Sequence, residues 1–263
     1  MNVQFCKYSA TGNTFLAFDN RKNNLLKGDP KFWESVANDN CVDGILFLEI
    51  SKIGHFKMTY LNADGIEAEM CGNGLRAITH FANSFVKIEK TNRFKIQTKN
   101  GFYLSTILED GRISVGMSEL RDVGLIDISF INKGSRSLYL DTGVPHAVFE
   151  YEGNVEDIDL MKIGATICNL PVFKNGTNVN FFQILNKRKI KGRTYERGVF
   201  RETLSCGTGA IAMAYTYSFF NQYKEEIEIE FPGGVLSVFQ GTGQNVWNLC
   251  GEVHKINEGV LEI

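Results

Sequence analysis

Apolar and polar residues alternate in many short runs along this chain of 263 residues. The segments Val3 to Tyr8, Gly44 to Ile50 and His55 to Asn62 have the pattern of β-strands, because apolar and β-branched residues lie between turn-forming ones. Asp29 and Pro30 precede an apolar spacing typical of a helix, since aspartate caps first-turn amides and proline fits the first helical position. The first part of the chain therefore predicts strands with one short helix among them.

A second helical pattern begins after Gly74, where apolar residues recur three and four positions apart. They are Leu75, Ile78, Ala82 and Phe85. Strands separated by turns are predicted next at 94–98, 101–108 and 112–117. This half of the chain predicts a sheet with a helix packed on one face.

The second half repeats the same order of strands, a helical pattern and further strands. The predicted strands are 137–140, 146–151, 178–185, 190–195, 227–231, 235–240 and 245–249, and the helical pattern is Ile211, Ala214, Tyr215 and Phe219. We place the boundary between the halves near Ser118 to Val123. The predicted domains are residues 1–117, with 256–263 returning to that half, and residues 118–255.

One motif occurs in both halves, at the start of each of the two related helical patterns. It reads Cys71-Gly72-Asn73-Gly74 in the first half and Cys206-Gly207-Thr208-Gly209 in the second, about half the chain apart. A thiolate is favoured at a helix start, where backbone N–H groups and the helix dipole face it. The glycines also expose consecutive N–H groups that can hold a carboxylate.

Two such thiols form an acid and base pair that can move a proton from one face of a carbon to the other. One thiolate would remove an α-proton and the second thiol would deliver a proton, while the helix ends stabilise the enolate-like charge. This chemistry predicts a racemase or epimerase without a cofactor and without a metal. The other four cysteines, Cys6, Cys41, Cys168 and Cys250, lack this context and are interpreted as small apolar residues.

The composition excludes several other classes. Hydrophobic residues make up 43% and charged residues 22%, and the net charge of −2 provides no field that would attract nucleic acid or an anionic membrane. The N-terminus has no signal-peptide pattern, and no apolar run is long enough for a membrane span. Six cysteines without a Cys-x-x-Cys pair do not indicate a disulfide scaffold or a zinc site. We therefore expect a cytoplasmic protein with reduced thiols.

Several ordered segments resemble the diaminopimelate epimerase family over the whole length of the chain. They are Thr11-Gly12-Asn13, Asn62-Ala63-Asp64-Gly65, Glu69 to Gly74, Pro145-His146, Tyr195 to Gly198 and Cys206 to Gly209. The resemblance implies an α+β fold of two related domains, each a curved, mostly antiparallel sheet around a central helix, with the active site in the cleft between them. It also implies the interconversion of L,L- and meso-diaminopimelate, a step towards lysine and peptidoglycan.

The resemblance also implies roles for particular residues. Cys71 and Cys206 would be the acid/base pair, and His146 and Glu196 would take part in the chemistry. Backbone amides of Gly72, Asn73, Gly207 and Thr208 would bind the reacting carboxylate. The remaining substrate-binding positions match Asn13, Asn62, Asn178, Glu196 and Arg197, where the last two are adjacent opposite charges suited to a zwitterion.

The chain departs from the family pattern at several positions. The usual His-Gly-x-Gly-Asn-Asp-Phe opening is here Ser9 to Phe15, a frequent glutamine is Gly44, and an asparagine that grips the far end of the substrate is Val144. A valine forms no hydrogen bond through its side chain, so this change predicts a looser substrate range. The family also implies a homodimer, but the C-terminal tyrosine that the family links to dimerisation aligns near Asn257, and this departure counts against the homodimer.

Three alternatives stay open at this point. The first is a racemase of another amino acid, such as glutamate or histidine, which Val144 and Gly44 favour. The second is a binding or redox module in which Cys71 and Cys206 close into a disulfide. The third is a nucleic-acid patch at Lys187 to Arg193, where a solvated hairpin is the favoured interpretation because no aromatic residues accompany the charges.

Overall fold

The computed structural model describes residues 2–25, 28–85, 92–117, 120–125, 136–241 and 246–262. The chain divides into two compact units. Unit 1 comprises Met1–Gly116 and Cys250–Ile263, and unit 2 comprises Met117–Leu249. Part of the boundary segment expected from the sequence, residues 118 and 119, lies outside the described residues.

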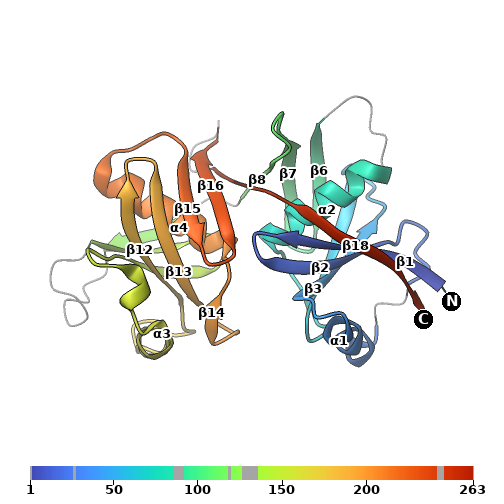
Figure 1. The fold of residues 1–263 in the computed structure, drawn as a ribbon, viewed down its shortest axis with the longest axis horizontal. Coiled ribbons are helices and arrows are strands. Elements are labelled where there is room, and N and C mark those ends of the chain that lie inside the picture. The colour runs from blue at the N-terminus through green and yellow to red at the C-terminus, as the bar shows by residue number, and fades with distance from the viewer. Residues whose placement is uncertain are drawn as a thin grey trace. The chain divides into compact units, whose positions relative to one another are not determined.

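Unit 1 consists of one sheet with helices on both of its faces (Figure 1). Its helices are α1 (Pro30–Asp39) and α2 (Gly72–Phe85). Its strands are β1 (Asn2–Ala10), β2 (Asn13–Asp19), β3 (Gly44–Glu49), β4 (Phe56–Asn62), β5 (Glu67–Ala68), β6 (Arg93–Thr98), β7 (Gly101–Ile107), β8 (Ile113–Gly116) and β18 (His254–Glu262).

The strands of unit 1 are mostly antiparallel, in the order β18-β1-β2-β3-β4-β6-β7-β8. The two parallel pairs are β2 with β3 and β4 with β6, and each requires a long connection. Helix α1 lies in the first connection, while β5 and α2 lie in the second. The C-terminal strand β18 pairs with β1 along its length, from Asn2 opposite Glu262 to Ser9 opposite His254.

Side-chain alternation explains how the unit 1 sheet packs helices on both faces. In β3, Ile45 and Phe47 join the apolar cluster around Trp33 of α1. Leu46 points the other way and lies against Gly74, at the start of α2. Strand β3 is therefore buried throughout.

Unit 2 has the same kind of layers. Its helical elements are α3 (Leu160–Cys168), α4 (Gly207–Asn221) and the 3-10 turn η1 (Val155–Asp157). Its strands are β9 (Arg121–Leu125), β10 (Ser137–Asp141), β11 (Pro145–Glu150), β12 (Asn178–Asn186), β13 (Lys189–Glu196), β14 (Arg201–Thr203), β15 (Ile227–Phe231), β16 (Gly234–Gln240) and β17 (Trp247–Gly251), the last of which ends in the C-terminal segment of unit 1.

The strand pairings of unit 2 repeat those of unit 1. Strands β11 and β12 are parallel with α3 between them, and β13 and β15 are parallel with β14 and α4 between them. The other pairs, β10 with β11, β12 with β13 and β15 with β16, are antiparallel. Strand β9 lies beside β10 as β18 lies beside β1. The repeated motif in the sequence thus reflects two copies of one topology.

The sequence pattern does not predict helix α3, the counterpart of α1. Its residues include a glycine and several β-branched side chains, which weaken the helical pattern. Asp159 caps the helix by accepting a hydrogen bond from the Lys162 amide over 3.2 Å. Gly164 is needed because a Cβ atom there would lie 2.6 Å from the Tyr195 side chain. Tertiary packing therefore determines this helix more than its local sequence does.

Alternation also divides the side chains of the unit 2 sheet between its two faces. Ala147, Phe149, Val179, Phe181 and Tyr195 join the apolar cluster on the α3 side. The residues between them, His146, Asn178, Asn180 and Thr194, therefore face the α4 side. These four polar residues thus lie on the sheet face that helix α4 covers.

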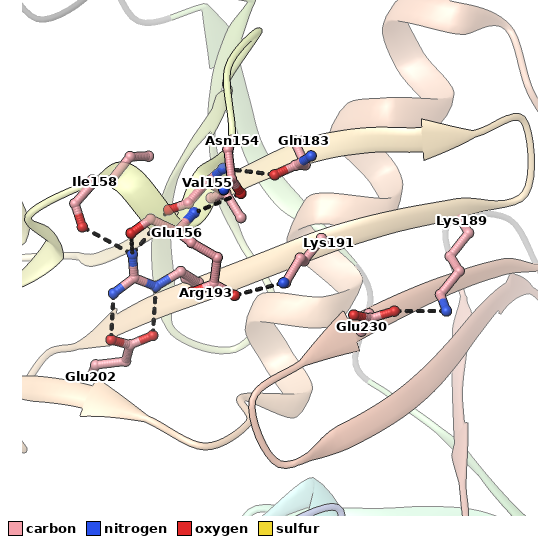
Figure 2. Close-up of polar contacts among 10 residues, drawn as sticks. All are labelled: Asn154, Val155, Glu156, Ile158, Gln183, Lys189, Lys191, Arg193, Glu202 and Glu230. Atoms are coloured by element: carbon pink, nitrogen blue, oxygen red, sulfur yellow. Dashed lines mark hydrogen bonds and ion pairs between the residues drawn. The ribbon is translucent and has the colours of Figure 1, made fainter.

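The basic residues of β13 are neutralised by carboxylates (Figure 2). Arg193 forms two parallel 2.7 Å hydrogen bonds to Glu202, and its third nitrogen donates to the carbonyls of Val155 and Ile158 at 2.9 Å. Lys191 pairs with Glu156 and Lys189 with Glu230, at 2.6 and 2.7 Å. These contacts join β13 to η1, β14 and β15, so the cluster is part of the scaffold.

Candidate active site

Both motif cysteines lie at helix starts and cap them in the same way. The Sγ atom of Cys71 accepts a hydrogen bond from the Gly74 amide over 3.3 Å, and the Sγ atom of Cys206 accepts one from the Gly209 amide over 3.3 Å. Each cysteine carbonyl accepts the first helical hydrogen bond, from Leu75 and from Ala210, at 2.8 Å. The two sulfurs are thus N-cap acceptors, a position that favours the thiolate.

Close packing explains why the third residue of each of these helices, Gly74 in α2 and Gly209 in α4, is a glycine. A Cβ atom at Gly209 would lie 2.6 Å from Oδ1 of Asn180. At Gly74 the nearest atom would be Cδ2 of Leu46, at 3.2 Å. The start of α4 is therefore held against a polar strand residue, and the start of α2 against an apolar one.

In unit 1 the first turn of α2 is fixed by a chain of polar contacts. Asn73 is buried, and its Nδ2 atom donates to Oδ1 of Asn13 at the start of β2. Its Oδ1 atom accepts from Nη2 of Arg76 over 2.6 Å. Asn13 and Asn73, both predicted to bind substrate, are thus brought together with Cys71, which precedes the same helix.

Arg76 is a buried cation that is not among the predicted site residues. Its side chain is fully buried, and besides Asn73 it donates to Oγ1 of Thr11 over 3.1 Å and to the Glu252 carbonyl over 3.0 Å. All three partners are neutral oxygen atoms. Burial lowers the pKa of Arg76 to about 10, an effect that the nearby thiols of Cys250 and Cys71 oppose. A positive charge therefore lies near the start of α2.

Arg76 also steadies the turn that carries Asn13. Thr11 and Gly12 connect β1 to β2 with φ angles of 51° and 84°, as in a tight two-residue hairpin. A β-branched residue rarely adopts this conformation, and the hydrogen bond from Arg76 to the Thr11 hydroxyl holds it there.

In unit 2, His146 lies on the sheet face beneath α4. It is fully buried, and its Nδ1 atom lies 3.0 Å from Nδ2 of Asn180. Its Nε2 atom is buried without a hydrogen-bond partner among the described residues. Burial lowers the pKa of His146 to about 3, and the charge of Arg197 adds to this shift. The imidazole is therefore neutral.

Asn178 connects two predicted site segments in this unit. Its Nδ2 atom donates to the Pro145 carbonyl over 3.0 Å, and its Oδ1 atom accepts from the Arg197 amide over 2.9 Å. The Arg197 guanidinium donates to the Asn175 carbonyl over 3.1 Å. Asn178 therefore sets the backbone position of Arg197 and of the residue before His146.

Glu196 ends β13, next to Arg197. Burial raises its pKa, and Thr203 and Arg201 oppose that effect. Thr208, in the first turn of α4, lies with its Oγ1 atom 3.4 Å from Sγ of Cys206. Unit 2 thus holds Cys206, Thr208, His146, Asn178 and the Glu196-Arg197 pair on neighbouring elements.

Asn62 stands apart from the other predicted residues of unit 1. It ends β4 with an exposed side chain, and its backbone forms the turn to Ile66. Gly65 completes this turn with a φ of +76°, and a Cβ atom there would clash with the Pro30 carbonyl at 2.0 Å. The structure fixes the position of Asn62 without giving its amide a partner among the interactions described.

One departure from the family pattern, Gly44, has a structural explanation. The space beside Gly44 is filled by Tyr60, whose ring would lie 2.5 Å from a Cβ atom. A glutamine side chain therefore does not fit there. Val144 is half-buried in the turn before β11, and its carbonyl accepts from the Thr142 amide over 3.1 Å. The backbone of this turn does not depend on the valine side chain.

Three residues of these contacts are not among those predicted from the sequence: Arg76, Asn180 and Thr194. Arg76 had a detectable signal, because it is the one charged residue in the sequence of α2. Asn180 follows Asn178 at the spacing that places two strand residues on the same face. Thr194 had no signal, since threonine is common in strands.

Among the described residues, no group of three or more His, Cys, Asp and Glu side chains is placed to hold a metal ion. In the same part of the chain, no helix is both long enough and apolar enough to cross a membrane. All six cysteines are free thiols.

Solved structures of similar fold cover the whole chain. A phenazine biosynthesis protein of the PhzF family from Bacillus anthracis matches with a TM-score of 0.78 at 15% identity, over 100% of both chains. A hydroxyproline epimerase from Agrobacterium vitis matches with a TM-score of 0.70 at 12% identity, over 99% of this chain and 92% of that one. The protein is thus an α+β protein with the two-unit fold of these proteins, as the sequence predicts.

Sequence similarity then defines the family. The profile of the family described as Diaminopimelate epimerase matches twice, at residues 5–123 and 138–256. The diaminopimelate epimerase of Thermotoga maritima is 34% identical over 260 residues, which is 95% of this chain and 99% of that protein. That of Methanocella arvoryzae is 34% identical over 281 residues, covering 99% and 97%. The chain belongs to the diaminopimelate epimerase family, and the resemblance inferred from its motifs is confirmed.

Proposed function

We propose that the protein is an isomerase that interconverts L,L-diaminopimelate and meso-diaminopimelate, with Cys71 and Cys206 as the two acid/base residues. The observation that supports this most directly is the twofold family match, one in each half of the chain, together with a helix-capping cysteine in each unit. Membership of the family supports the substrate, and the two N-cap sulfurs support the chemistry.

Each cysteine has what a proton-transfer residue needs. The Gly74 and Gly209 amides donate to the sulfurs, and the helix dipoles favour negative charge at the same place. In the proposed reaction, one thiolate removes the α-proton of the substrate and the other thiol delivers a proton to the opposite face. The α-carbon loses one proton and gains one, so the first sulfur ends as a thiol and the second as a thiolate. The reverse reaction exchanges the two roles.

The reacting carboxylate would bind to the first-turn amides of the two helices. Gly72, Asn73, Gly207 and Thr208 supply these N–H groups, which have no helical acceptor of their own. The positive end of each helix would stabilise the charge that develops on the carboxylate in the transition state. Arg76 adds a fixed positive charge near the start of α2.

Asn62, Asn178, Glu196 and Arg197 would hold the rest of the substrate. Diaminopimelate has an ammonium and a carboxylate at each end, so adjacent acid and base side chains match its charge pattern. The product would feed lysine and peptidoglycan synthesis. Both thiols must stay reduced for the reaction, which fits a cytoplasmic location.

A racemase of glutamate or histidine is the second candidate, and Val144 favours it. The half-buried valine provides no side-chain hydrogen bond at a position where the family grips the far end of its substrate. A shorter amino acid would lose less from this change than diaminopimelate does.

The experiment is to incubate purified, reduced protein with L,L-diaminopimelate, L-glutamate or L-histidine and to separate the stereoisomers by chiral chromatography. We expect meso-diaminopimelate as the main product, and no turnover in Cys71→Ser or Cys206→Ser. Cys168→Ser is the matched control, because this buried cysteine ends α3, and it should keep full activity. Full activity in either motif variant would refute the two-thiol proposal, and exclusive turnover of glutamate or histidine would refute the substrate.

A further inference from the structure

Asn180 connects His146 to the start of the cysteine-bearing helix α4. Its Nδ2 atom lies 3.0 Å from Nδ1 of His146 and donates to the Ala147 carbonyl over 3.2 Å. Its Oδ1 atom accepts from the Thr194 hydroxyl over 2.9 Å and lies directly beneath Gly209. All of these groups are buried. One amide therefore touches the histidine, two strands and the first turn of α4.

These contacts fix which way the Asn180 amide points. The Ala147 carbonyl can only accept a hydrogen bond, so the amide nitrogen must be the atom next to it. The same NH₂ group then faces Nδ1 of His146, and the only hydrogen bond it can make there is as donor. Nδ1 is therefore an acceptor without a proton, and the ring proton is on Nε2.

The protonated nitrogen has no hydrogen-bond partner in the described part of the chain. Nε2 of His146 is buried and forms no hydrogen bond with the described residues. A buried donor left in this state costs free energy unless another group accepts from it. Helix α4, which begins after Cys206, and Arg197 both belong to the proposed site. A substrate carboxylate or a cysteine thiolate in that site is therefore the acceptor that fits the Nε2–H group.

We propose that Asn180 is a positioning residue that holds His146 as the neutral Nε2–H tautomer, so that His146 serves as a hydrogen-bond donor in the reaction and not as a proton acceptor. This inference deepens the proposed function and rests on it for the role of His146 in turnover. It leaves proton abstraction to the two thiols. The charge of Arg197 acts in the same direction because it disfavours an imidazolium.

The tautomer is measured by NMR of protein labelled with ¹⁵N at histidine, without substrate. Of the four histidines in the chain, His146 is assigned by comparison with His146→Gln. We expect an unprotonated Nδ1, a protonated Nε2 and no titration of this ring between about pH 5 and 9. A protonated Nδ1, or a ring that gains a second proton in this range, would overturn the proposal whether or not the protein epimerises diaminopimelate.

Asn180→Asp tests the positioning role. A carboxylate in place of the amide can only accept, so it should draw the ring proton to Nδ1 and raise the pKa of His146. We expect the ¹⁵N pattern to invert and kcat to fall at least tenfold, with a smaller change in KM. The matched control is Asn169→Asp, the same change at the exposed C-cap of α3, which should alter neither the His146 signals nor kcat.

The outcomes separate a failure of this inference from a failure of the proposed function. An inverted tautomer with unchanged kcat would refute the role of His146 as donor. If Asn180→Asp does not fold, the spectrum of the unmodified protein decides the tautomer by itself. If the folded protein shows the expected tautomer but epimerises none of the three amino acids tested above, the proposed function fails and the assignment of the tautomer stands.

Discussion

The amide nitrogen of Gly209 donates a hydrogen bond to the Sγ atom of Cys206 over 3.3 Å, and this contact repeats between Gly74 and Cys71. The repeat shows that the two halves retain the same local geometry at the same helix position. The surroundings differ, because Gly209 lies against the polar Asn180 and Gly74 against the apolar Leu46. The same glycine-to-alanine change should therefore have different effects at Gly209 and at Gly74.

Gly209→Ala should be more damaging than Gly74→Ala. The new methyl group would lie 2.6 Å from Oδ1 of Asn180 in the first case and 3.2 Å from Cδ2 of Leu46 in the second. Overpacking of a buried site costs about 1–3 kcal/mol, and a leucine side chain can shift more easily than a hydrogen-bonded amide. We expect the larger loss of urea stability and of kcat in Gly209→Ala. Equal effects, or a greater loss in Gly74→Ala, would contradict the packing described here.

Arg76→Met should slow the chemical modification of Cys71 and spare Cys206. The guanidinium provides a positive charge near the Cys71 thiol, and its loss removes an interaction that favours the thiolate. We expect alkylation of Cys71 by iodoacetamide at neutral pH to slow roughly three- to tenfold, equivalent to about one pKa unit or less. Mass spectrometry of the two cysteine peptides measures both rates in one sample.

Cys206 is the internal control in that experiment, since Ile211 occupies the position in α4 that Arg76 occupies in α2. The variant also removes the hydrogen bonds to Asn73 and Thr11. Turnover should therefore fall together with the reactivity of Cys71. An unchanged Cys71 rate, or equal slowing at both cysteines, would argue against a specific effect of Arg76.

His146 should make the protein less stable in acid. Its pKa in the folded protein is about 3, against an ordinary value of 6.5. Below pH 6.5 the unfolded chain therefore takes up a proton at this residue and the folded protein does not. The stability contributed by the neutral ring is fully present above that pH and is lost as the pH falls towards 3, at a slope approaching about 1.4 kcal/mol per pH unit.

Urea denaturation of the unmodified protein and of His146→Gln at several pH values between about 4 and 7 measures this contribution. Other titrating groups affect both proteins equally, so the difference between the two curves isolates His146. We expect the unmodified protein to lose more stability than the variant as the pH falls. Parallel curves would show that the ring is accessible to protons in the folded state.

Val144→Asn should increase the preference for diaminopimelate over glutamate. The turn at this position is held by the Thr142 amide bonded to the Val144 carbonyl, and by the Gly143 amide bonded to Asp141 at 2.6 Å. The backbone should therefore tolerate the change. A new hydrogen bond to the far end of the substrate would raise the ratio of the two kcat/KM values about tenfold. An unchanged ratio would remove Val144 as a determinant of specificity.

The sequence predicted the central helices and their cysteines because two signals agreed there. Apolar spacing after Gly74 and near Ile211 indicated buried helices, and the repeated Cys-Gly-x-Gly motif indicated their starts. The structure gives these helices the same N-cap contact. Local sequence was sufficient, since capping depends on neighbours in the chain.

Other features depend on contacts between distant segments, which local patterns do not show. Helix α3 depends on Gly164, which allows the helix to pack against Tyr195 of strand β13. The ring of His146 is neutral because it is buried, and its tautomer depends on Asn180. The position of Asn73 depends on Arg76 and on Asn13 in a preceding hairpin. The sequence could indicate His146 and Asn73 through family resemblance, but only the folded chain provides the partners that set their protonation and orientation.

The most direct test of the central claim is the early incorporation of deuterium when the reduced protein converts L,L-diaminopimelate in D₂O. Two thiols acting from opposite faces predict deuterium at the inverted α-carbon of the first meso-diaminopimelate formed, while the remaining L,L-diaminopimelate stays unlabelled. Equal labelling of substrate and product from the start would indicate a single base. Product without deuterium, or no product, would contradict the reaction proposed for Cys71 and Cys206.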